Sequence, residues 1–446
     1  MKKEEYLEIL TEQIRCKMAR GAVAEEIRWH IEDQTEAFLS EGMERKEAEE
    51  AAVREMGDPV EVGQDMDRIH RPKMAWSMIA LIAAVSVAGY LLKFGIERAV
   101  GIEGSGWLRS GRQLQFLLLG LAVMAGICFV DYTRIALRAR EILIVFYLCL
   151  VTGVLFLRIN VNGLHLWIRL GSFGSVGIVP LLCLTVPLYA AVLYRYRGQG
   201  CVVAVKALLW MLPALGIALA CPSLAALVTV FYSCLIVFAV AVYRKWFRVP
   251  VKIFLAGTAA AAVLCPLAGC GYIWFLGDTY QQERLRVLLQ FDFSDGNYRM
   301  ELVRNILGQS RMVGESAVFA EQAKGLAMSE IMITGIAGYY GLAAAVLLAA
   351  AVLALFLVFL RISLRQRNCL GMLMGCGCTA VLLVQTLTYL AVNLGLFSLG
   401  SDCPFVSAGG SSTLVTYILL GILLSICRYQ NTAPEIRKFA GMFRAA

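Results

Sequence analysis

The sequence predicts an all-α membrane protein, with about ten transmembrane helices behind a small, soluble, helical amino-terminal domain. Of its 446 residues, 59% are hydrophobic, whereas soluble domains are closer to half apolar. So much apolar surface requires lipid as its solvent. Apolar runs of about 17 to 25 residues, the length that spans a bilayer, follow one another after residue 73, while the first seventy residues are rich in charge.

Residues 1–70 are predicted to form an acidic, cytosolic domain of three or four short amphipathic helices. This segment holds ten Lys/Arg against nineteen Asp/Glu. Apolar residues recur at helical spacing in it, at Leu7, Leu10 and Ile14 and then at Ile27, Ile31 and Phe38. The charged start lacks the apolar core of a signal peptide, so we expect the domain to stay in the cytosol.

The end of this domain carries residues that are typical of a helix end followed by a new helix start. Gly57 suits the position after a helix, and Asp58-Pro59 supplies an N-cap and a first-turn proline for the next helix. The stretch Glu55-Met-Gly-Asp-Pro-Val-Glu-Val62 resembles the helical prefix domain that precedes the first span of some bacterial permeases and signalling proteins. The resemblance implies a regulatory role, or contact with a cytosolic partner of unknown identity.

Residues 74–428 are predicted to form the membrane domain, in which ten apolar runs are long enough to cross a bilayer. They are Met74–Leu92, Leu114–Val130, Ile142–Leu157, Val176–Leu193, Val202–Ala218, Leu224–Val242, Ile253–Phe275, Ile331–Leu360, Cys369–Val392 and Leu414–Ile426. The closely spaced fifth and sixth runs are the least distinct.

Basic residues predict the orientation of these spans. They gather after the second, fourth, sixth and eighth spans, as Arg134/Arg138/Arg140, Arg195/Arg197/Lys206, Arg244/Lys245/Arg248/Lys252 and Arg361/Arg365/Arg367. The tail, 429–446, is basic as well. By the positive-inside rule both termini are cytoplasmic, in a multi-pass protein of the bacterial cytoplasmic membrane. Because the orientation of the spans accounts for the excess of basic residues, we expect no nucleic-acid partner.

Three outward segments are too long for simple turns: 158–175, 277–330 and 394–410. The largest, 277–330, carries several carboxylates among arginines, and loops of this length are often functional. The third ends in Pro404-Phe-Val-Ser-Ala-Gly-Gly-Ser-Ser412, at the outward start of the last span. Backbone N–H groups at such a helix start favour an anion such as a pyrophosphate, although the same residues also suit helix capping and close packing.

Several motifs resemble those of the SEDS proteins, the FtsW/RodA/SpoVE family. Residues 404–412 are similar to the family's Pro-Phe-Ile/Val-Ser-Tyr-Gly-Gly-Ser-Ser, and Trp167-Ile-Arg-Leu-Gly171 is similar to its Trp-Ile-x-Leu-Gly. Tyr280-Gln-Gln-Glu-Arg284 resembles its Tyr-Gln-x-x-Arg, and 291–298 resembles its aspartate-containing loop motif. The resemblance covers the whole membrane part, and the family has ten spans with both termini inside.

The resemblance implies a peptidoglycan glycosyltransferase that polymerises lipid II at the outer membrane face, beside a class B penicillin-binding transpeptidase, in cell elongation, division or sporulation. It places the catalytic base of an inverting glycosyl transfer at Asp295, with Asp292 as second choice. The implied substrate-binding residues are Trp167, Tyr280, Gln281, Arg284, Ser407, Gly409, Gly410, Ser411 and Ser412. A divalent cation, Mg or Mn, is a candidate aid to the leaving group, with no ligands assigned and no other cofactor expected.

The chain also departs from the family pattern. Leu166 replaces an arginine, Val176-Gly-Ile-Val179 replaces Gln-Pro-Ser-Glu, and Ser223 replaces an aspartate. Gly338-Tyr-Tyr-Gly341 stands for Glu-Glu-Leu-Gly, and the proline after the loop aspartate is missing. These changes leave two alternatives open: a catalytically inactive scaffold or regulator of wall synthesis, or a flippase for lipid-linked precursors, which would need a polar path through its spans.

Overall fold

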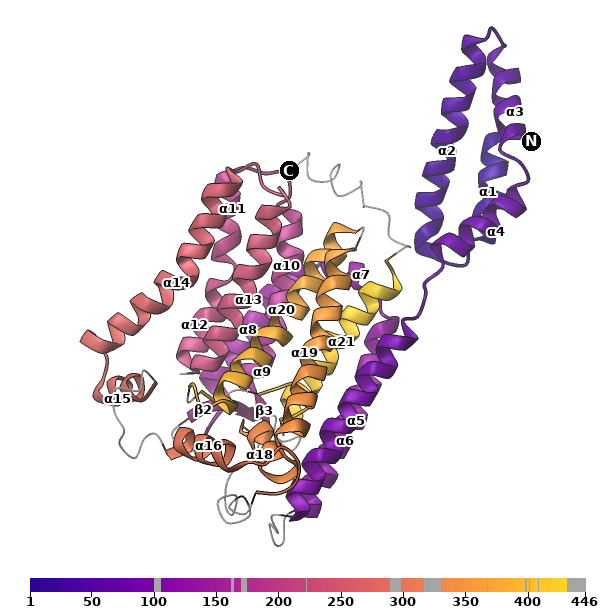
Figure 1. Ribbon diagram of the computed structural model, residues 1–446. Coiled ribbons are helices and arrows are strands. Elements are labelled where there is room, and N and C mark those ends of the chain that lie inside the picture. Colours follow the sequence, from indigo (N-terminus) through magenta and orange to yellow (C-terminus); the bar gives the residue numbers. More distant parts are fainter. Residues whose placement is uncertain are drawn as a thin grey trace. The chain divides into compact units, whose positions relative to one another are not determined.

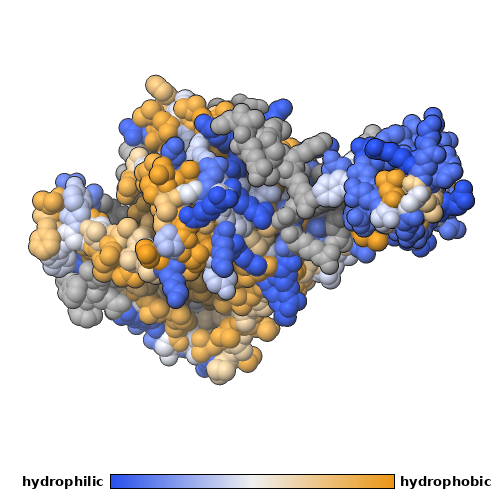
Figure 2. Space-filling model, turned by 90° about the horizontal axis from the view of Figure 1, so that it is seen from above, coloured by the Kyte–Doolittle hydropathy of each residue, from blue (hydrophilic) through white to orange (hydrophobic). Residues whose placement is uncertain are grey.

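The fold was analysed in a computed structural model. It describes residues 1–99, 106–161, 164–169, 175–221, 223–288, 298–316, 319, 330–366, 368–397, 399–400, 402–407 and 409–430. The chain divides into two compact units, Met1–Ala75 and most of the residues between Trp76 and Ser425. Hydrophilic residues cover most of the first unit, whereas hydrophobic residues are spread widely over the second (Figure 2).

The first unit is a bundle of four helices, α1 (Lys3–Gln13), α2 (Lys17–Ser40), α3 (Arg45–Glu55) and α4 (Pro59–His70). Its core contains Leu10, Ile14 and Ile31, each fully buried. The predicted helix end at Gly57 and helix start at Asp58 are confirmed. Gly57 has a φ of +84°, and the Asp58 side chain accepts a hydrogen bond from the Val60 amide at 3.3 Å, at the start of α4.

Close packing and one buried carboxylate fix α4 against α1. Gly63 lies so near α1 that a Cβ there would be 2.7 Å from the Leu10 carbonyl oxygen. Asp67, largely buried, accepts a hydrogen bond from the Arg15 amide at 2.8 Å. That amide lies in the short connection between α1 and α2, so the bond to Asp67 ties this connection to α4.

The described part of the second unit contains ten helices that are long and apolar enough to span a membrane, which confirms the predicted number. They are α5 (Trp76–Ala99), α6 (Gly106–Phe129), α8 (Ala139–Phe156), α9 (Ile178–Cys183) continued by α10 (Thr185–Arg195), α11 (Cys201–Leu209) continued by α12 (Leu212–Ala220), α13 (Leu224–Tyr243), α14 (Val251–Leu276), α19 (Leu342–Leu364), α20 (Cys369–Asn393) and α21 (Gly410–Arg428). A short helix, α7 (Tyr132–Leu137), follows α6.

The spans differ in how much protein surrounds them. Helix α20 lies among the others, and most of its residues are buried. Helix α14 leans away from the bundle (Figure 1), and none of its residues is buried. Phe275 and Leu276, at its end, are 80% and 73% exposed. Side chains of this kind are stable there only if lipid or another protein covers them.

One predicted span is wrong in its bounds, because the run Ile331–Leu360 is broken in two. Helix α18 (Met332–Tyr340) ends at Gly341, which has a φ of +104°, and α19 begins at Leu342. The segment 311–316 pairs with the broken ends: Leu342 N donates to Arg311 O at 2.9 Å, and Ser316 N donates to Gly338 O at 2.8 Å. The break is therefore a tertiary feature, which apolar composition could not reveal.

Strands between residues 158 and 177 form a small sheet that the sequence analysis did not predict. Strands β1 (Arg158–Val161), β2 (Leu164–Arg169) and β3 (Ser175–Gly177) pair antiparallel, in the order β1-β2-β3. Val176, predicted as the start of a span, lies in β3 instead. The sheet, α15 (Thr279–Leu288), α16 (Tyr298–Gln309) and α18 lie at one end of the helical bundle (Figure 1), which we call the loop end.

Candidate functional site

The loop before α21 folds into a tight turn at the loop end. Ser407, largely buried, accepts a hydrogen bond at its Oγ from the Cys403 amide at 2.8 Å. Phe405 has a φ of +69°, a left-handed conformation that is costly for a bulky side chain and is held only by its surroundings. The Thr413 amide donates to the Gly409 carbonyl at 2.9 Å, which closes the first turn of the helix.

This helix start is bonded directly to the small sheet. The Gly177 amide, at the end of β3, donates to Ser411 Oγ at 3.0 Å. Gly177 is in turn the strand partner of Trp167 in β2. Two motifs far apart in sequence, the Trp-Ile-Arg-Leu-Gly stretch and the Gly-Gly-Ser-Ser stretch, therefore meet at one place.

The carboxylate of this helix start is Asp402, which the sequence analysis missed. Ser412 donates a side-chain hydrogen bond to it, which by itself would lower its pKa. Burial outweighs that bond and, together with the nearby negative charge of Glu330, raises the pKa of Asp402 to about 6 from 3.8. A carboxylate with such a pKa can accept a proton near neutral pH. Its signal was a lone acidic residue two positions before the Pro404 motif.

Glu330 and α16 enclose the neighbouring part of the site. The Arg299 guanidinium, from the first turn of α16, pairs with the Glu330 carboxylate. Arg304, one turn further on, donates through Nε and Nη2 to the Gly395 carbonyl at 3.2 and 2.9 Å. Asn393 Nδ2 donates to the Glu330 carbonyl at 3.2 Å. Helix α16 is thus fastened to the residues that follow α20.

The predicted loop residues are placed less completely. Asp292 and Asp295 lie outside the described residues. Tyr280 and Arg284 belong to α15, and only their backbone is described. Gln281 is exposed and its Oε1 accepts a hydrogen bond from the Asp278 amide at 3.4 Å, so it caps α15.

One cationic side chain near the site, Arg286, is in contact with an aromatic ring. The Arg286 guanidinium stacks on the Trp274 ring, 5.7 Å from its centroid, where α15 meets the end of α14. Among the residues described, no three His, Cys, Asp or Glu side chains gather as they would around a metal ion.

The site can therefore hold an anion and move a proton. The first turn of α21 presents backbone N–H groups of Gly410, Ser411 and Ser412, and a helix start of this length attracts negative charge. Asp402 stands beside these groups as a proton acceptor. An arrangement of this kind suits a reaction whose leaving group is an anion and whose nucleophile loses a proton.

Comparisons with known proteins agree with this picture. The chain is 36% identical over 95 residues to a probable peptidoglycan glycosyltransferase FtsW of Geobacter sulfurreducens, a stretch that covers 21% of this chain and 26% of that relative. It is 28% identical over 130 residues to the protein of the same name from Geobacter metallireducens, covering 29% of this chain and 34% of that one. The aligned stretches thus span about a third or less of these relatives.

Solved structures share the fold over most of the chain. One, described under structural coordination of polymerization and crosslinking by a peptidoglycan synthase complex, has a TM-score of 0.65 at 22% identity, covering 80% of this chain and 98% of that one. The rod shape determining protein RodA of Thermus thermophilus has a TM-score of 0.57 at 20% identity, covering 80% and 97%.

The sequence model of the family described as "Cell cycle protein", FTSW_RODA_SPOVE, matches residues 73–432. This range contains the ten membrane helices found among the described residues and both motifs that meet at the start of α21. The chain therefore belongs to the FtsW/RodA/SpoVE family.

Proposed function

We propose that the protein is a peptidoglycan glycosyltransferase that polymerises lipid II at the outer face of the cytoplasmic membrane. One observation supports this most: the sheet carrying Trp167, the helix start at Ser411 and the carboxylate of Asp402 meet at the loop end. Family membership and the names of the relatives point the same way. The basic loops between the spans support an outward orientation of the loop end.

The reaction is an inverting glycosyl transfer. A sugar hydroxyl attacks the anomeric carbon of a second lipid-linked sugar, a new C–O bond forms, and the bond from that carbon to the pyrophosphate breaks. Asp295 is the first candidate for the base that takes the hydroxyl proton, and Asp292 is the second. Asp402 adds a third carboxylate, whose raised pKa suits proton transfer near neutral pH.

The pyrophosphate leaves with additional negative charge. The N–H groups at the start of α21, together with Arg284 and Arg286, are the candidates to stabilise it. A divalent cation, Mg or Mn, would supply further positive charge if residues of the 289–297 segment helped to hold it. The proposed partner is a class B penicillin-binding transpeptidase, in line with the polymerization and crosslinking named for the structural relative.

A catalytically inactive scaffold is the second candidate, and one observation favours it. Gly338 stands where the family has a glutamate, and its surroundings leave no room for one: a Cβ there would be 2.4 Å from the Phe319 ring and 3.0 Å from the Ile306 side chain. The Phe319 and Ile306 side chains thus occupy the space that a side chain at position 338 would need. Activity must then depend on the carboxylates that remain.

The deciding experiment supplies the purified full chain with labelled lipid II and Mg or Mn, with and without the transpeptidase, and measures glycan polymer on gels. We expect polymer from the wild type, and a loss of about 100-fold or more for Asp295→Asn, as for the removal of a general base. The matched control Asp278→Asn, an exposed carboxylate at the start of α15, should keep wild-type activity.

Each outcome separates the candidates. A wild type that makes no polymer in any of these conditions supports the scaffold. Polymer that survives Asp295→Asn but is lost in Asp292→Asn or Asp402→Asn moves the base to that residue. Lipid II that crosses a vesicle bilayer without being polymerised would instead support the flippase.

A further inference from the structure

Two connections between spans are joined at the end of the membrane unit opposite the loop end. One links α10 to α11, and the other, residues 244–250, links α13 to α14. The Gly198 amide donates to the Trp246 carbonyl at 2.6 Å, and the Arg248 amide donates to the Gln199 carbonyl at 2.9 Å. Helix α14 runs from the 244–250 connection to α15 at the loop end, so the connection lies at the other end of that helix (Figure 1).

The 244–250 connection is held in place by packing. Trp246 and Phe247 are 3% and 2% exposed. The Tyr194 ring packs edge-on against the Trp246 ring, with 5.5 Å between the centroids, and the Arg197 guanidinium lies 5.8 Å from the centroid of the Trp246 ring. Because these two residues are anchored in the protein, the charged residues on either side of them have fixed backbone positions.

Lys245 ends α13 with a backbone conformation that favours glycine. Its φ is +58°. The Lys245 amide donates to the Val242 carbonyl at 2.9 Å, and the Trp246 amide donates to the Ala241 carbonyl at 3.1 Å. This is the bonding pattern of a helix end at which glycine is the usual residue. A lysine is strained there, so the turn itself does not account for the lysine side chain, and strain of this kind indicates a functional use.

The charge of this region has one sign. The sequence contains no Asp or Glu in residues 142–277. The connection and the first turn of α14 hold Arg244, Lys245, Arg248 and Lys252. Arg244 donates to the last carbonyl of α19 at 3.0 Å. The other three are exposed, and no carboxylate of the described residues pairs with any of them.

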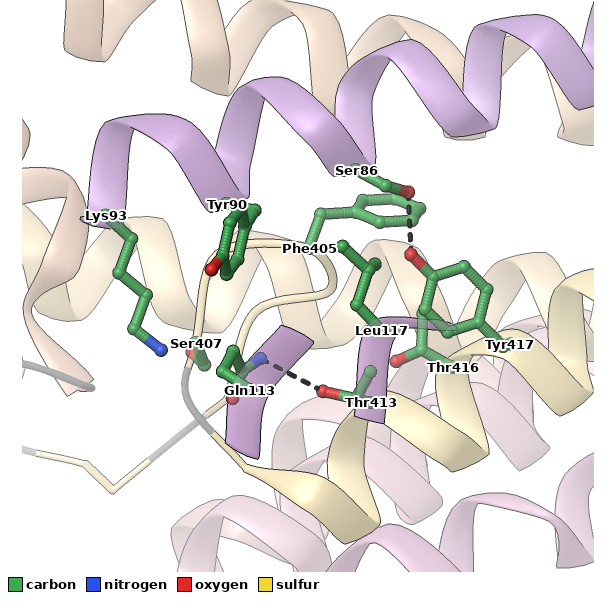
Figure 3. A pocket seen from close by; sticks show the side chains of 10 residues that line it. All are labelled: Ser86, Tyr90, Lys93, Gln113, Leu117, Phe405, Ser407, Thr413, Thr416 and Tyr417. Carbon is green, nitrogen blue, oxygen red and sulfur yellow. Dashed lines mark hydrogen bonds between the residues drawn. The ribbon is translucent and has the colours of Figure 1, made fainter. Parts of the chain in front are cut away.

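These three cations differ from the lysine that lies inside the membrane unit. Lys93 lines a small pocket between α5, α6 and α21 (Figure 3). It is 4% exposed, and Glu97 Oε1 lies 3.8 Å from its Nζ, so its charge is compensated within the protein. Lys245, Arg248 and Lys252 lie at the surface instead, where an anion from outside the chain can reach them.

Exposed apolar side chains adjoin the three cations. Tyr243, the last residue of α13, is 69% exposed, and Ile253, in the first turn of α14, is 68% exposed. Both helices are long and apolar enough to span a membrane, so the connection lies where their apolar stretches end. An acidic protein would match the cations but not the apolar side chains beside them. A lipid with a negative headgroup matches both.

We propose that the 244–250 connection and the first turn of α14 bind the headgroup of an anionic phospholipid. Lys245, Arg248 and Lys252 are its cationic ligands, and Tyr243 and Ile253 contact its acyl chains. The positive-inside rule requires only basic residues in a loop, and it accounts for neither the buried anchor nor the left-handed lysine. The proposal does not depend on the proposed glycosyl transfer, and it holds for either leaflet.

The test measures lipid binding to the purified full chain by native mass spectrometry. The probes are dioleoyl phosphatidylglycerol, dioleoyl phosphatidylcholine, which has the same chains without net charge, and glycerol phosphate, which has no chains. The triple variant Lys245→Gln, Arg248→Gln and Lys252→Gln should weaken binding of phosphatidylglycerol by about tenfold or more. The wild type should bind each of the other two probes at least about tenfold more weakly.

A second basic region at the same end provides the matched control. Arg134, Arg138 and Arg140, in and beside α7, are also exposed, but Asp131 and Glu141 flank them. Changing these three arginines to glutamine removes the same amount of charge. It should alter binding of phosphatidylglycerol less than about twofold, because the neighbouring carboxylates offset part of that charge. Equal losses in both triple variants would mean that total charge attracts the lipid, and would overturn the proposal.

Lys245→Gly separates the charge of Lys245 from its backbone conformation. Glycine adopts a left-handed backbone freely, so this variant should keep or raise the wild-type melting temperature. It should still weaken binding of phosphatidylglycerol by about threefold or more. Wild-type binding by this variant, or equal binding of phosphatidylcholine, would contradict the proposal. So would a preference of the three cations for a polyglutamate peptide over phosphatidylglycerol, since the surface would then fit an acidic protein.

Discussion

The four-helix unit buries apolar side chains, whereas the membrane unit exposes apolar side chains and buries several polar ones. In the first, Leu10 and Ile31 are fully buried, and hydrophilic residues cover most of the surface (Figure 2). In the second, Leu347 is 73% exposed, whereas Asn393 and Thr334 are almost completely buried. Water expels apolar groups into the first unit, while lipid offers no partner to polar groups of the second, so they must bond to one another. The two units should therefore respond differently to the same substitution.

The largest effect is expected in the core of the four-helix unit. Leu10→Ala removes a fully buried side chain from a small bundle and should lower the free energy of unfolding by about 3–4 kcal/mol. A unit of about seventy residues has little stability to spare, so we expect it to unfold. Hydrogen exchange should then show lost protection across residues 1–70.

Two leucines serve as controls for this prediction. Leu39→Ala, in the same unit but 38% exposed, should leave the protection of residues 1–70 almost unchanged. Leu387 lies on the membrane unit and is 55% exposed, so lipid or detergent contacts its side chain in both the folded and the unfolded unit. Leu387→Ala should therefore change the stability of that unit only slightly in detergent or nanodiscs. If Leu387→Ala destabilised its unit as much as Leu10→Ala does, the contrast between the units would be wrong.

A buried polar residue should matter most in the membrane unit. Asn393 accepts hydrogen bonds at Oδ1 from the Thr334 amide at 3.0 Å and the Thr334 hydroxyl at 3.1 Å, and its Nδ2 donates to Tyr389 O and Glu330 O. Asn393→Leu takes this partner from the Thr334 amide and the Glu330 carbonyl inside the protein, while the Thr334 hydroxyl keeps its bond to the backbone carbonyl of residue 393 at 3.0 Å. The cost should be about 2–3 kcal/mol, measured as a lower midpoint of thermal unfolding in detergent.

Thr388→Val is the matched control for Asn393→Leu. Thr388 lies on the same helix, and its hydroxyl bonds within α20, to the Val384 carbonyl at 2.8 Å. Its loss should therefore change the midpoint by much less. A midpoint for Asn393→Leu within error of the Thr388→Val value would show that the Asn393 bonds contribute nothing to the unit.

The same contrast explains what the sequence could predict. Hydropathy identified ten spans because a helix in lipid must be apolar for its full length, whichever neighbours it has. It could not show the break at Gly341, since α18 and α19 are both apolar and the break depends on contact with the backbone at Met312. The sheet formed by strands between residues 158 and 177 was not predicted for a similar reason, because strands this short are defined by their pairing.

The site was predicted unevenly for reasons that lie in single residues. The Pro404–Ser412 motif was recognisable, but Asp402 stands just outside it and becomes notable only through its burial beside Ser412. The basic residues between α13 and α14 were recognised as well, but their arrangement was not. The left-handed backbone of Lys245 and the burial of Trp246 depend on packing that the sequence does not show.

The smallest of these effects should appear at Asp402, where a charge rather than a neutral group is buried. Its pKa of about 6 in the folded protein exceeds the ordinary value of 3.8. Such a group contributes stability below about pH 4, and that contribution is lost as the pH rises toward 6 and the buried carboxyl ionises. We expect a loss of about 2 kcal/mol, since two pKa units correspond to somewhat more and the side chain is not fully enclosed.

Asp402→Asn isolates this charge, because the amide oxygen can still accept the Ser412 hydroxyl proton. Between pH 4.5 and 7.5 the wild type should lose more thermal stability than the variant does, and the variant should be the more stable of the two at pH 7.5. Asp278→Asn, at an exposed position, should follow the wild-type profile. Parallel profiles for Asp402→Asn and the wild type would mean that Asp402 titrates as a solvated carboxylate, and the membrane unit would then hold its charges at the loop end in water rather than in protein.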